Sequence, residues 1–222
     1  MIYLPMAQID ESTEGLLNQP IPTWLDHTYP HIPPPTAEVT LQELEHLVAI
    51  LPERAHWLPF IEAADKDPGG LFLCLCERLG VPCSRDELNQ IIGDAAVLIT
   101  QLKWEYNRAR PYQIARKHGR LDFSALPSVS AHTPAYPAGH TIGALLIADR
   151  LSKRAPQHRE AFHKLAQQIS YSRVVAGYHW PSDLVFGKAI VEHALRQSAK
   201  KRLLCCVLLL GAGAYFLKAV MA

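Results

Sequence analysis

The chain has 222 residues, of which 49% are hydrophobic and 19% are charged. That length and composition predict one globular domain with a sizeable core. The formal net charge is +1 and no long basic run is present, so we exclude nucleic acid as a partner. The five cysteines are odd in number and lack zinc-ligand spacing, which argues against a disulfide framework but leaves a single bridge open.

The N-terminal segment, residues 1–37, is irregular and rich in proline, and it ends in Pro33-Pro34-Pro35. We expect an extended arm that lies over the body or takes part in assembly. Residues 1–10 lack the charged start and the long apolar stretch of a signal peptide. An intracellular, reducing location is therefore the default expectation.

Residues 38–199 carry helical patterns and form the predicted domain. Thr40 and Glu43 make a capping-box signature for a helix that reaches about Leu51, and two short helices are expected over 54–66 and 70–79. Ser84 and Glu87 make a second capping box, which opens a long helix. One face of that helix is an apolar stripe of Leu88, Ile91, Ile92, Ala95, Leu98, Ile99 and Leu102.

The same helix carries Lys103, and Arg110 follows seven residues later. Because seven residues make close to two helical turns, we expect both cations to project from one helix face. Pro111, which has no amide hydrogen, is expected to end the helix. Residues 112–139 are then predicted to be a loop that forms the rim of the substrate site. Its candidates to touch a leaving group are Tyr112, His118, His132 and Tyr136.

A turn at residues 135–141 opens onto the next apolar run. Gly139 permits a close backbone approach, and a helix that begins there would direct free amides toward an anion. His140, beside those amides, is placed to act as a general acid. Helices are expected over about 140–154, 157–176 and 181–199, and no strand-like alternation persists. The predicted fold class is all-α, a helical bundle.

His179 lies four residues before Asp183, with Pro181 between them at an expected first helical position. The carboxylate can accept a hydrogen bond from one imidazole nitrogen, which leaves the other nitrogen free as a nucleophile. Arg173 would add a planar fork of donors for phosphate oxygens. The histidine–aspartate pair could also be a helix cap or half of a metal site. A zinc site would need further ligands such as His118, His132 or His140.

Together these stretches resemble the motifs of the type 2 phosphatidic acid phosphatase superfamily, which includes soluble class A acid phosphatases and vanadium haloperoxidases. The family pattern is K-x6-R-P, then P-S-G-H, then S-R-x5-H-x3-D, and this chain matches its order and spacing from Lys103 to Asp183. The resemblance implies a bundle of the phosphatase and haloperoxidase kind that extends from about Pro33 to about Ala199.

The resemblance also implies a role for each motif residue. It assigns His179 as nucleophile, His140 as acid and Asp183 as the group that orients His179. It assigns phosphate binding to Lys103, Arg110, Arg173, Gly139 and the residue at position 138. That last residue is Ala138, where the family has serine. The lost hydroxyl should cost about 1.5–3 kcal/mol of binding to a charged group.

The sequence thus predicts a metal-independent phosphatase without a cofactor. It would act on phosphomonoesters, pyrophosphates or lipid phosphates through a phosphohistidine. The first alternative is a vanadate-dependent haloperoxidase, in which His179 binds vanadate. The second alternative is a non-catalytic anion-binding or scaffold protein, which the alanine at position 138 and the proline-rich arm motivate.

The C-terminal segment, residues 200–222, begins with Lys200-Lys201-Arg202 and continues as an apolar run. That run has fifteen residues before Lys218, fewer than the roughly 20 that a spanning helix needs, although Lys218 can snorkel. Two interpretations stay open for residues 203–222. The segment is either a membrane anchor with its cations on the cytoplasmic side, or a helix that packs against the body or a second copy in a homo-oligomer.

Overall fold

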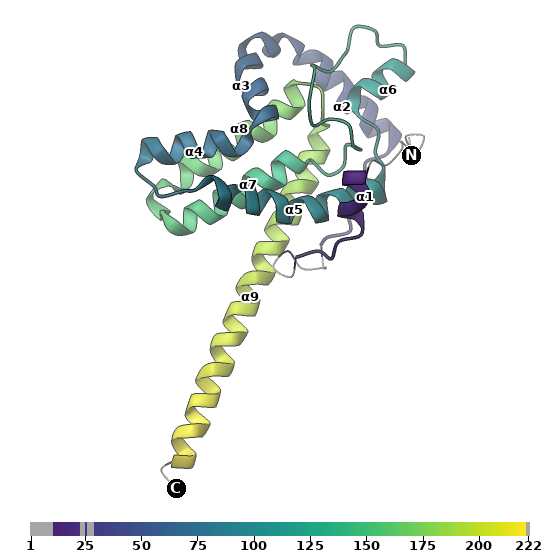
Figure 1. Ribbon diagram of the computed structural model, residues 1–222. Helices are drawn as coiled ribbons and strands as arrows, with labels where there is room; N and C mark the ends of the chain where they lie inside the picture. The colour runs from purple at the N-terminus through teal and green to yellow at the C-terminus, as the bar shows by residue number, and fades with distance from the viewer. Residues whose placement is uncertain (1–10, 23–24, 26–28, 221–222) are drawn as a thin grey trace.

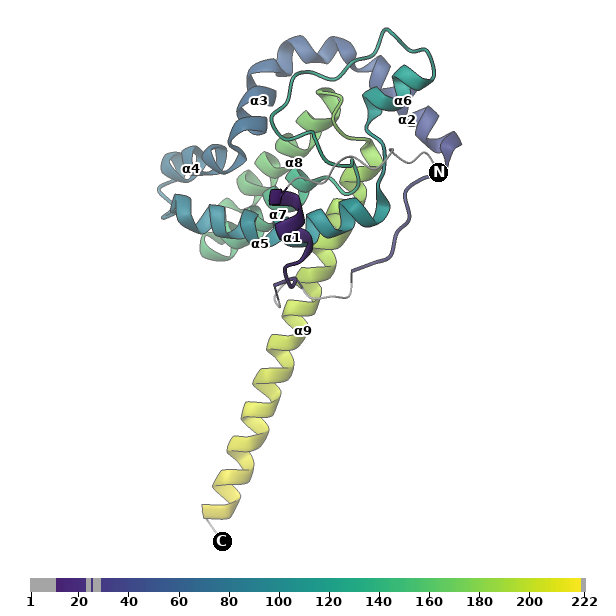
Figure 2. The same ribbon diagram turned by 45° about the vertical axis from the view of Figure 1, so that its right-hand side comes forward.

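The structure is a computed structural model that describes residues 11–22, 25 and 29–220. Helices gather into a body, and the C-terminal half of the last helix extends away from it in both views (Figures 1 and 2). Among the described residues there is no strand, so the predicted all-α fold class is confirmed. The α-helices of the described residues are α1 (Glu11–Leu17), α2 (Ala37–Ala49), α3 (Arg54–Lys66), α4 (Pro68–Leu79), α5 (Arg85–Tyr106), α6 (Pro111–Lys117), α7 (Gly139–Arg154), α8 (Arg159–Val175) and α9 (Pro181–Val220). In the same residues, short 3-10 turns are formed by Leu51–Glu53 and Pro156–His158.

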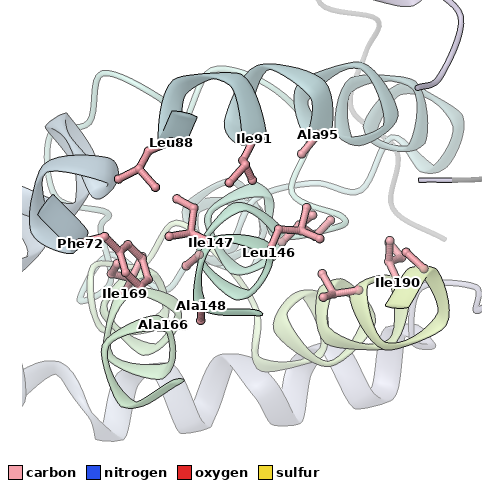
Figure 3. Close-up of a cluster of buried hydrophobic side chains, with 14 of the residues drawn as sticks. Phe72, Leu88, Ile91, Ala95, Leu146, Ile147, Ala148, Ala166, Ile169 and Ile190 are labelled. Carbon is pink, nitrogen blue, oxygen red and sulfur yellow. The ribbon is translucent and has the colours of Figure 1, made fainter. Parts of the chain in front are cut away.

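The main core surrounds α7, which packs against α5, α8 and α9. Figure 3 shows its apolar side chains pointing inward from α4, α5, α8 and α9. The α5 stripe is buried as predicted, except that Ile92 and Ile99 are only partly buried. Labelled members of this core are Phe72, Leu88, Ile91, Ala95, Leu146, Ile147, Ala148, Ala166, Ile169 and Ile190.

A second apolar cluster joins α2, α6 and the end of α8. Its largest member, Trp180, is fully buried and donates its indole hydrogen to the Ala109 carbonyl at 2.8 Å. Members of both clusters are sequence neighbours of the predicted site residues. Leu102 and Ile142 belong to the main core, and Ala109, Val174 and Trp180 belong to the second cluster.

The first predicted capping box was wrong. Helix α2 begins at Ala37, and the Thr36 hydroxyl caps it by accepting from the Val39 amide at 3.4 Å. Thr40 is a buried interior residue, and Glu43 bonds to Arg108 and Ser182. The second box was right in position, because Ser84 accepts from the Glu87 amide at 3.2 Å.

The prediction that Lys103 and Arg110 share one helix face was also wrong. Helix α5 ends at Tyr106, because Asn107 adopts the left-handed conformation (φ 43°), which asparagine tolerates better than most residues. Arg110 is extended (ψ 155°), since a residue before proline avoids the helical region. Pro111 thus starts α6 instead of ending α5, and residues 112–117 are helical where a loop was expected.

The two terminal segments also differ from their predictions in part. The N-terminal arm contains a helix, α1, that packs against α5, while residues 1–10 lie outside the described residues. Helix α9 continues past residue 199 to Val220, and the side chains of 201–222 lie outside the description. No helix in the described part of the chain is both long and apolar enough to cross a membrane. The three cysteines with described side chains are free thiols.

Candidate active site

The three motif stretches lie together at the end of α5, the start of α7 and the turn from α8 into α9. The Ala138 amide donates to the Asp183 carbonyl at 3.1 Å, which ties the start of α7 to the start of α9. At Gly187 of α9 an added Cβ would come within 3.2 Å of the Ala138 carbonyl oxygen, so the two helices approach closely because residue 187 has no side chain.

The turn after α8 depends on a glycine as well. Gly177 has φ 83°, and the His179 and Tyr178 amides then both donate to the Arg173 carbonyl, at 3.2 and 3.0 Å. This turn folds the chain back so that His179 lies next to Arg173. Pro181 begins α9 as predicted, and it brings Asp183 under the His179 ring.

The hydrogen bonds of His179 define its tautomer. Nδ1 lies 3.0 Å from Asp183 Oδ2, and Nε2 lies 3.0 Å from Arg110 Nη1. Because a guanidinium can only donate, Nε2 must be the acceptor, and Nδ1 therefore carries the hydrogen that Asp183 accepts. Burial, together with Arg110, Lys103 and Arg173, lowers the pKa of His179 well below its usual value. The ring is thus neutral, with its Nε2 lone pair on the side of the cations.

Asp183 receives two further donors, Arg108 Nη1 at 2.6 Å on Oδ1 and the Trp180 amide at 2.9 Å on Oδ2. Burial raises the pKa of Asp183 to about 6, while Arg108 and the Trp180 amide act in the opposite direction. Above that pH the carboxylate is ionised. It is then a strong acceptor for the His179 Nδ1 hydrogen.

The three predicted cations are all buried, and each lies close enough to influence the ionisation of His179. Burial and the nearby Arg110 lower the pKa of Lys103 well below its usual value. Lys103 Nζ donates to the Pro134 carbonyl, and Arg110 Nε donates to the Thr133 carbonyl at 2.8 Å. Backbone carbonyls of the segment before α7 therefore hold these two side chains.

Some of the hydrogen-bond donors of Arg173 are paired with protein groups and others are not. Its Nη2 bonds to Asp65 Oδ1 at 2.5 Å and to the Ser130 hydroxyl at 3.0 Å, and the guanidinium lies 4.4 Å from the Tyr178 ring centre. Its Nε and Nη1 are buried and have no hydrogen-bond partner in the described part of the chain. Leaving such donors unpaired is costly, so this arrangement is typical of a site that takes an anion.

Asp65 of α3 belongs to the site although the sequence reasoning missed it. Its carboxylate accepts hydrogen bonds from Ser128, Ser130 and the Val129 amide, as well as from Arg173. Burial alone would raise its pKa, but these hydrogen bonds and the Arg173 charge hold the pKa at about 2. Asp65 thus anchors Arg173 and the loop at 128–130. No motif marks this residue, because its partners are all distant in the sequence.

The start of α7 brings amides and His140 to the same place. Gly139 is the first residue of the helix and Ala138 is its N-cap, so the amides of Gly139, His140 and Thr141 lack intrahelical acceptors. The amide of Ala138 itself is bonded to Asp183. Burial and the nearby Arg173 lower the pKa of His140 to about 3. The structure therefore brings Lys103, Arg110, Gly139, His140, Arg173, His179 and Asp183 together around one region.

The four residues predicted to line the rim of the substrate site do not lie together. Tyr112 and His132 line a cavity of about 450 Å³, whereas His118 is exposed at the end of α6. Tyr136 is a core residue, since it stacks on Phe186 at 4.4 Å and donates to the Ile32 carbonyl at 3.0 Å. Among the described residues, no three His, Cys, Asp or Glu side chains are grouped so that they could hold a metal ion.

A second cavity, of about 200 Å³, runs between α5 and α7 and reaches Lys103 and His140. Its walls are mainly apolar, and the two partly buried residues of the α5 stripe contribute to them. The apolar lining includes Pro68, Ile92, Ala96, Ile99, Gly143 and Ile147. We call this cavity the α5–α7 groove.

Comparisons with known proteins agree with this architecture. The chain is 29% identical over 143 residues to a non-specific acid phosphatase of Providencia stuartii, which covers 60% of this chain and 56% of that protein. It is 34% identical over 97 residues to a lipid A 1-phosphatase of Rhizobium johnstonii, which covers 43% of this chain and 38% of that protein. The chain thus spans about half the length, or less, of these curated relatives.

Among solved structures, the fold is similar to a transmembrane PAP2 type phosphatidylglycerolphosphate phosphatase from Bacillus subtilis. The TM-score is 0.51 at 21% identity, over 74% of this chain and 88% of that one. The model of the PAP2 superfamily matches residues 88–195, the part of the chain that contains every motif residue named above. Together with the gathered motif residues, the family match and the two curated relatives support the resemblance to the PAP2 superfamily.

Proposed function

We propose that this protein is a phosphatase that hydrolyses phosphate esters through a phosphohistidine, without a metal. The observation that carries the proposal is the pair of unpartnered, buried Arg173 donors close to His179. A phosphoryl group between them would meet a ready set of cations, and transfer of such a group depends mainly on positioning and electrostatic stabilisation. The relatives whose names describe an activity are phosphatases, so the haloperoxidase alternative is not favoured.

In the first step His179 Nε2 attacks phosphorus, and the bond from phosphorus to the ester oxygen breaks. The leaving oxygen takes a proton from His140, so that an alcohol departs. In the second step the neutral His140 accepts a proton from water, and the water oxygen attacks phosphorus. The nitrogen–phosphorus bond breaks, inorganic phosphate forms and His179 returns to its starting state. Lys103, Arg110, Arg173 and the Gly139 amide would hold the phosphoryl oxygens throughout.

His140 must be protonated in the first step, although its buried surroundings lower its pKa to about 3. Burial causes much of that shift, and nearby Arg173 adds to it because it disfavours a further positive charge. A bound phosphate brings negative charge among these cations and would raise the pKa of His140. We therefore infer that the proton arrives with the substrate, which binds as its monoanion.

The α5–α7 groove bears on the substrate class. It reaches His140, the residue that would protonate the leaving oxygen, and its walls are mainly apolar. An alcohol that leaves from phosphorus would therefore meet an apolar surface. We infer that phosphate esters of apolar alcohols, lipid phosphates among them, are better substrates than esters of polar alcohols such as sugars.

Hydrolysis of a series of alkyl phosphates in the presence of a chelator tests this function and substrate class. We expect turnover without metal, and a rise in kcat/KM of about fourfold for each added methylene until the groove is filled. Gly143→Leu is the matched variant, because residue 143 lines the groove and an added Cβ there would make only ordinary contact with Ile92, at 3.8 Å. It should abolish the gain with chain length while short esters are still hydrolysed. A flat series in the native protein would contradict the groove assignment, and no hydrolysis of any ester would contradict the function.

Ala138→Ser should increase activity. Serine at the N-cap of α7 can accept a hydrogen bond from the helix and still donate its hydroxyl hydrogen to a phosphate oxygen. A hydrogen bond to a charged group is worth about 1.5–3 kcal/mol, so kcat/KM should rise roughly tenfold to hundredfold. The measurement is kcat/KM of the native protein and of the variant on one ester, from steady-state kinetics. An absence of turnover in both forms would instead favour the scaffold alternative.

A further inference from the structure

Arg108 is a buried cation that the motif pattern does not include. It lies on the extended segment between α5 and α6, and only 6% of its side chain is exposed. The guanidinium lies over two aromatic rings, 5.1 Å from the ring centre of Trp180 and 5.8 Å from that of Tyr136. Because the guanidinium is itself planar, its hydrogen-bond donors point in defined directions.

Those donors point to two elements. Nη1 donates to Asp183 Oδ1 and to the Ser182 hydroxyl, both at 2.6 Å, at the start of α9. Nη2 donates to Glu43 Oε2 at 2.8 Å and to the Thr40 hydroxyl at 3.3 Å, on α2. Both terminal nitrogens are thus occupied by protein acceptors. Arg108 differs in this from Arg173, whose unpartnered donors are available to an anion.

We propose that Arg108 is a positioning residue, which fixes the Asp183 carboxylate so that its other oxygen faces His179 Nδ1. The proposal rests on the proposed function, in which His179 is the nucleophile. The hydrogen bonds of the two Asp183 carboxylate oxygens support this proposal. Oδ1 accepts from Arg108, while Oδ2 accepts from the Trp180 amide and lies 3.0 Å from His179 Nδ1. With Oδ1 fixed from the far side, rotation of the carboxylate away from the imidazole would break the ion pair.

Glu43 completes the arrangement from α2. One of its oxygens accepts from the Ser182 amide at 2.7 Å, and the other accepts from the Ser182 hydroxyl at 2.9 Å and from Arg108. Glu43 therefore satisfies an amide in the first turn of α9 and holds the guanidinium at the same time. A carboxylate there also suits the positive end of the helix dipole. Through this contact α2, which carries none of the motif residues, sets the position of Arg108.

Arg108 should also affect the pH at which Asp183 ionises. The charged or titratable groups around this carboxylate are His179, Lys103, Tyr136, Arg108 and Arg110, with Glu43 beyond Arg108. Burial raises the pKa of Asp183 to about 6 and Arg108 opposes that rise. Removal of the Arg108 charge should raise this pKa further. Because the ionised carboxylate is the active form, activity would then be lost at a higher pH as the solution is acidified.

The test compares Arg108→Gln with Arg108→Lys in the full chain. For the glutamine variant we expect kcat to fall roughly 10- to 100-fold with a smaller change in KM, since positioning groups act on the nucleophile and not on substrate binding. The acid limb of its pH–kcat profile should move up by about one pH unit. Arg154→Gln is the matched control, because Arg154 also pairs with a carboxylate, Glu87, at 2.7 Å, but lies at the far end of α7. It should leave both kcat and the acid limb unchanged.

The lysine variant separates charge from geometry. Lysine keeps the positive charge but lacks the planar fork that serves Asp183 and Glu43 together. Its acid limb should therefore stay near that of the native protein, while kcat falls roughly three- to tenfold. If the glutamine variant does not fold, the lysine variant alone decides, and native kcat in it would overturn the proposal.

Nitrogen-15 NMR of the His179 ring gives a readout that does not depend on turnover. In the native protein Nδ1 should be protonated and Nε2 unprotonated, and in Arg108→Gln a mixture of tautomers should appear. An unchanged tautomer together with an unchanged acid limb would overturn the role of Arg108. An inactive native protein whose His179 still changes tautomer on this substitution would contradict the proposed function and leave the positioning role standing.

Discussion

The His179→Ala variant is expected to lose phosphatase activity by roughly 10⁴-fold or more, because the attacking atom itself is removed. In the native protein Nε2 is the only ring nitrogen placed on the side of the cations, since Nδ1 is bonded to Asp183. Alanine leaves a small space in which water could attack directly, but without a positioned nucleophile. Binding of phosphate should persist, because the cations remain. The measurement is the steady-state rate on p-nitrophenyl phosphate with a chelator present.

Two controls accompany this variant. His56→Ala removes an exposed histidine of α3 and should leave the rate within about twofold of the native value, as surface changes generally have small effects. Mass spectrometry of protein quenched during turnover should find a phosphoryl group on the His179 peptide of the native protein and none in the variant. Native-like hydrolysis by His179→Ala would refute the assignment of the nucleophile.

The Asp183→Asn variant has the second largest expected effect, a fall in kcat of roughly 10³- to 10⁴-fold. Arg108, the Trp180 amide and the His179 Nδ1 hydrogen all donate to this carboxylate. Asparagine has one acceptor oxygen and two hydrogens of its own, so it cannot satisfy all three donors. We expect the amide hydrogens to face His179 in part of the molecules. That would favour the tautomer in which Nε2 is protonated and cannot attack.

This loss should appear in kcat, with KM changed much less, because Asp183 does not face the substrate. A matched control is Asp122→Asn, an exposed carboxylate that pairs with Arg120 at 3.0 Å. It should have the kinetics of the native protein. Since Asp183 is fully buried, thermal unfolding should accompany the kinetic measurement. A folded Asp183→Asn protein with native kcat would show that tautomer control is unnecessary.

The local features of the fold could be read from the sequence. The apolar stripe on α5 predicted a buried helix face, and the structure buries most of it. Pro181 before Asp183 predicted the start of α9, and the histidine–aspartate contact follows from that helical spacing. These predictions succeeded because the interactions involved lie within one or two helical turns.

The errors occurred where a short-range pattern had two possible outcomes. Thr36 and Thr40 could each begin a helix, and only packing buried Thr40 and directed Glu43 to α9. Lys103 and Arg110 have helical spacing, but Asn107 in the left-handed conformation ends α5 between them. The two cations still meet at the site, because the extended segment after α5 turns Arg110 back toward it.

By itself, the sequence determined most of the helices, the apolar face of α5 and the motif residues to which we assign the chemistry. Only the tertiary structure decided which further groups support them. Asp65 forms an ion pair with Arg173, Arg108 forms one with Asp183, and apolar walls lie beside His140. The reason is physical. Burying a charge is favourable only when a partner of opposite charge or a hydrogen-bond donor comes to meet it. In this protein those partners come from α3 and from the segment after α5, and sequence spacing cannot predict such contacts between distant segments.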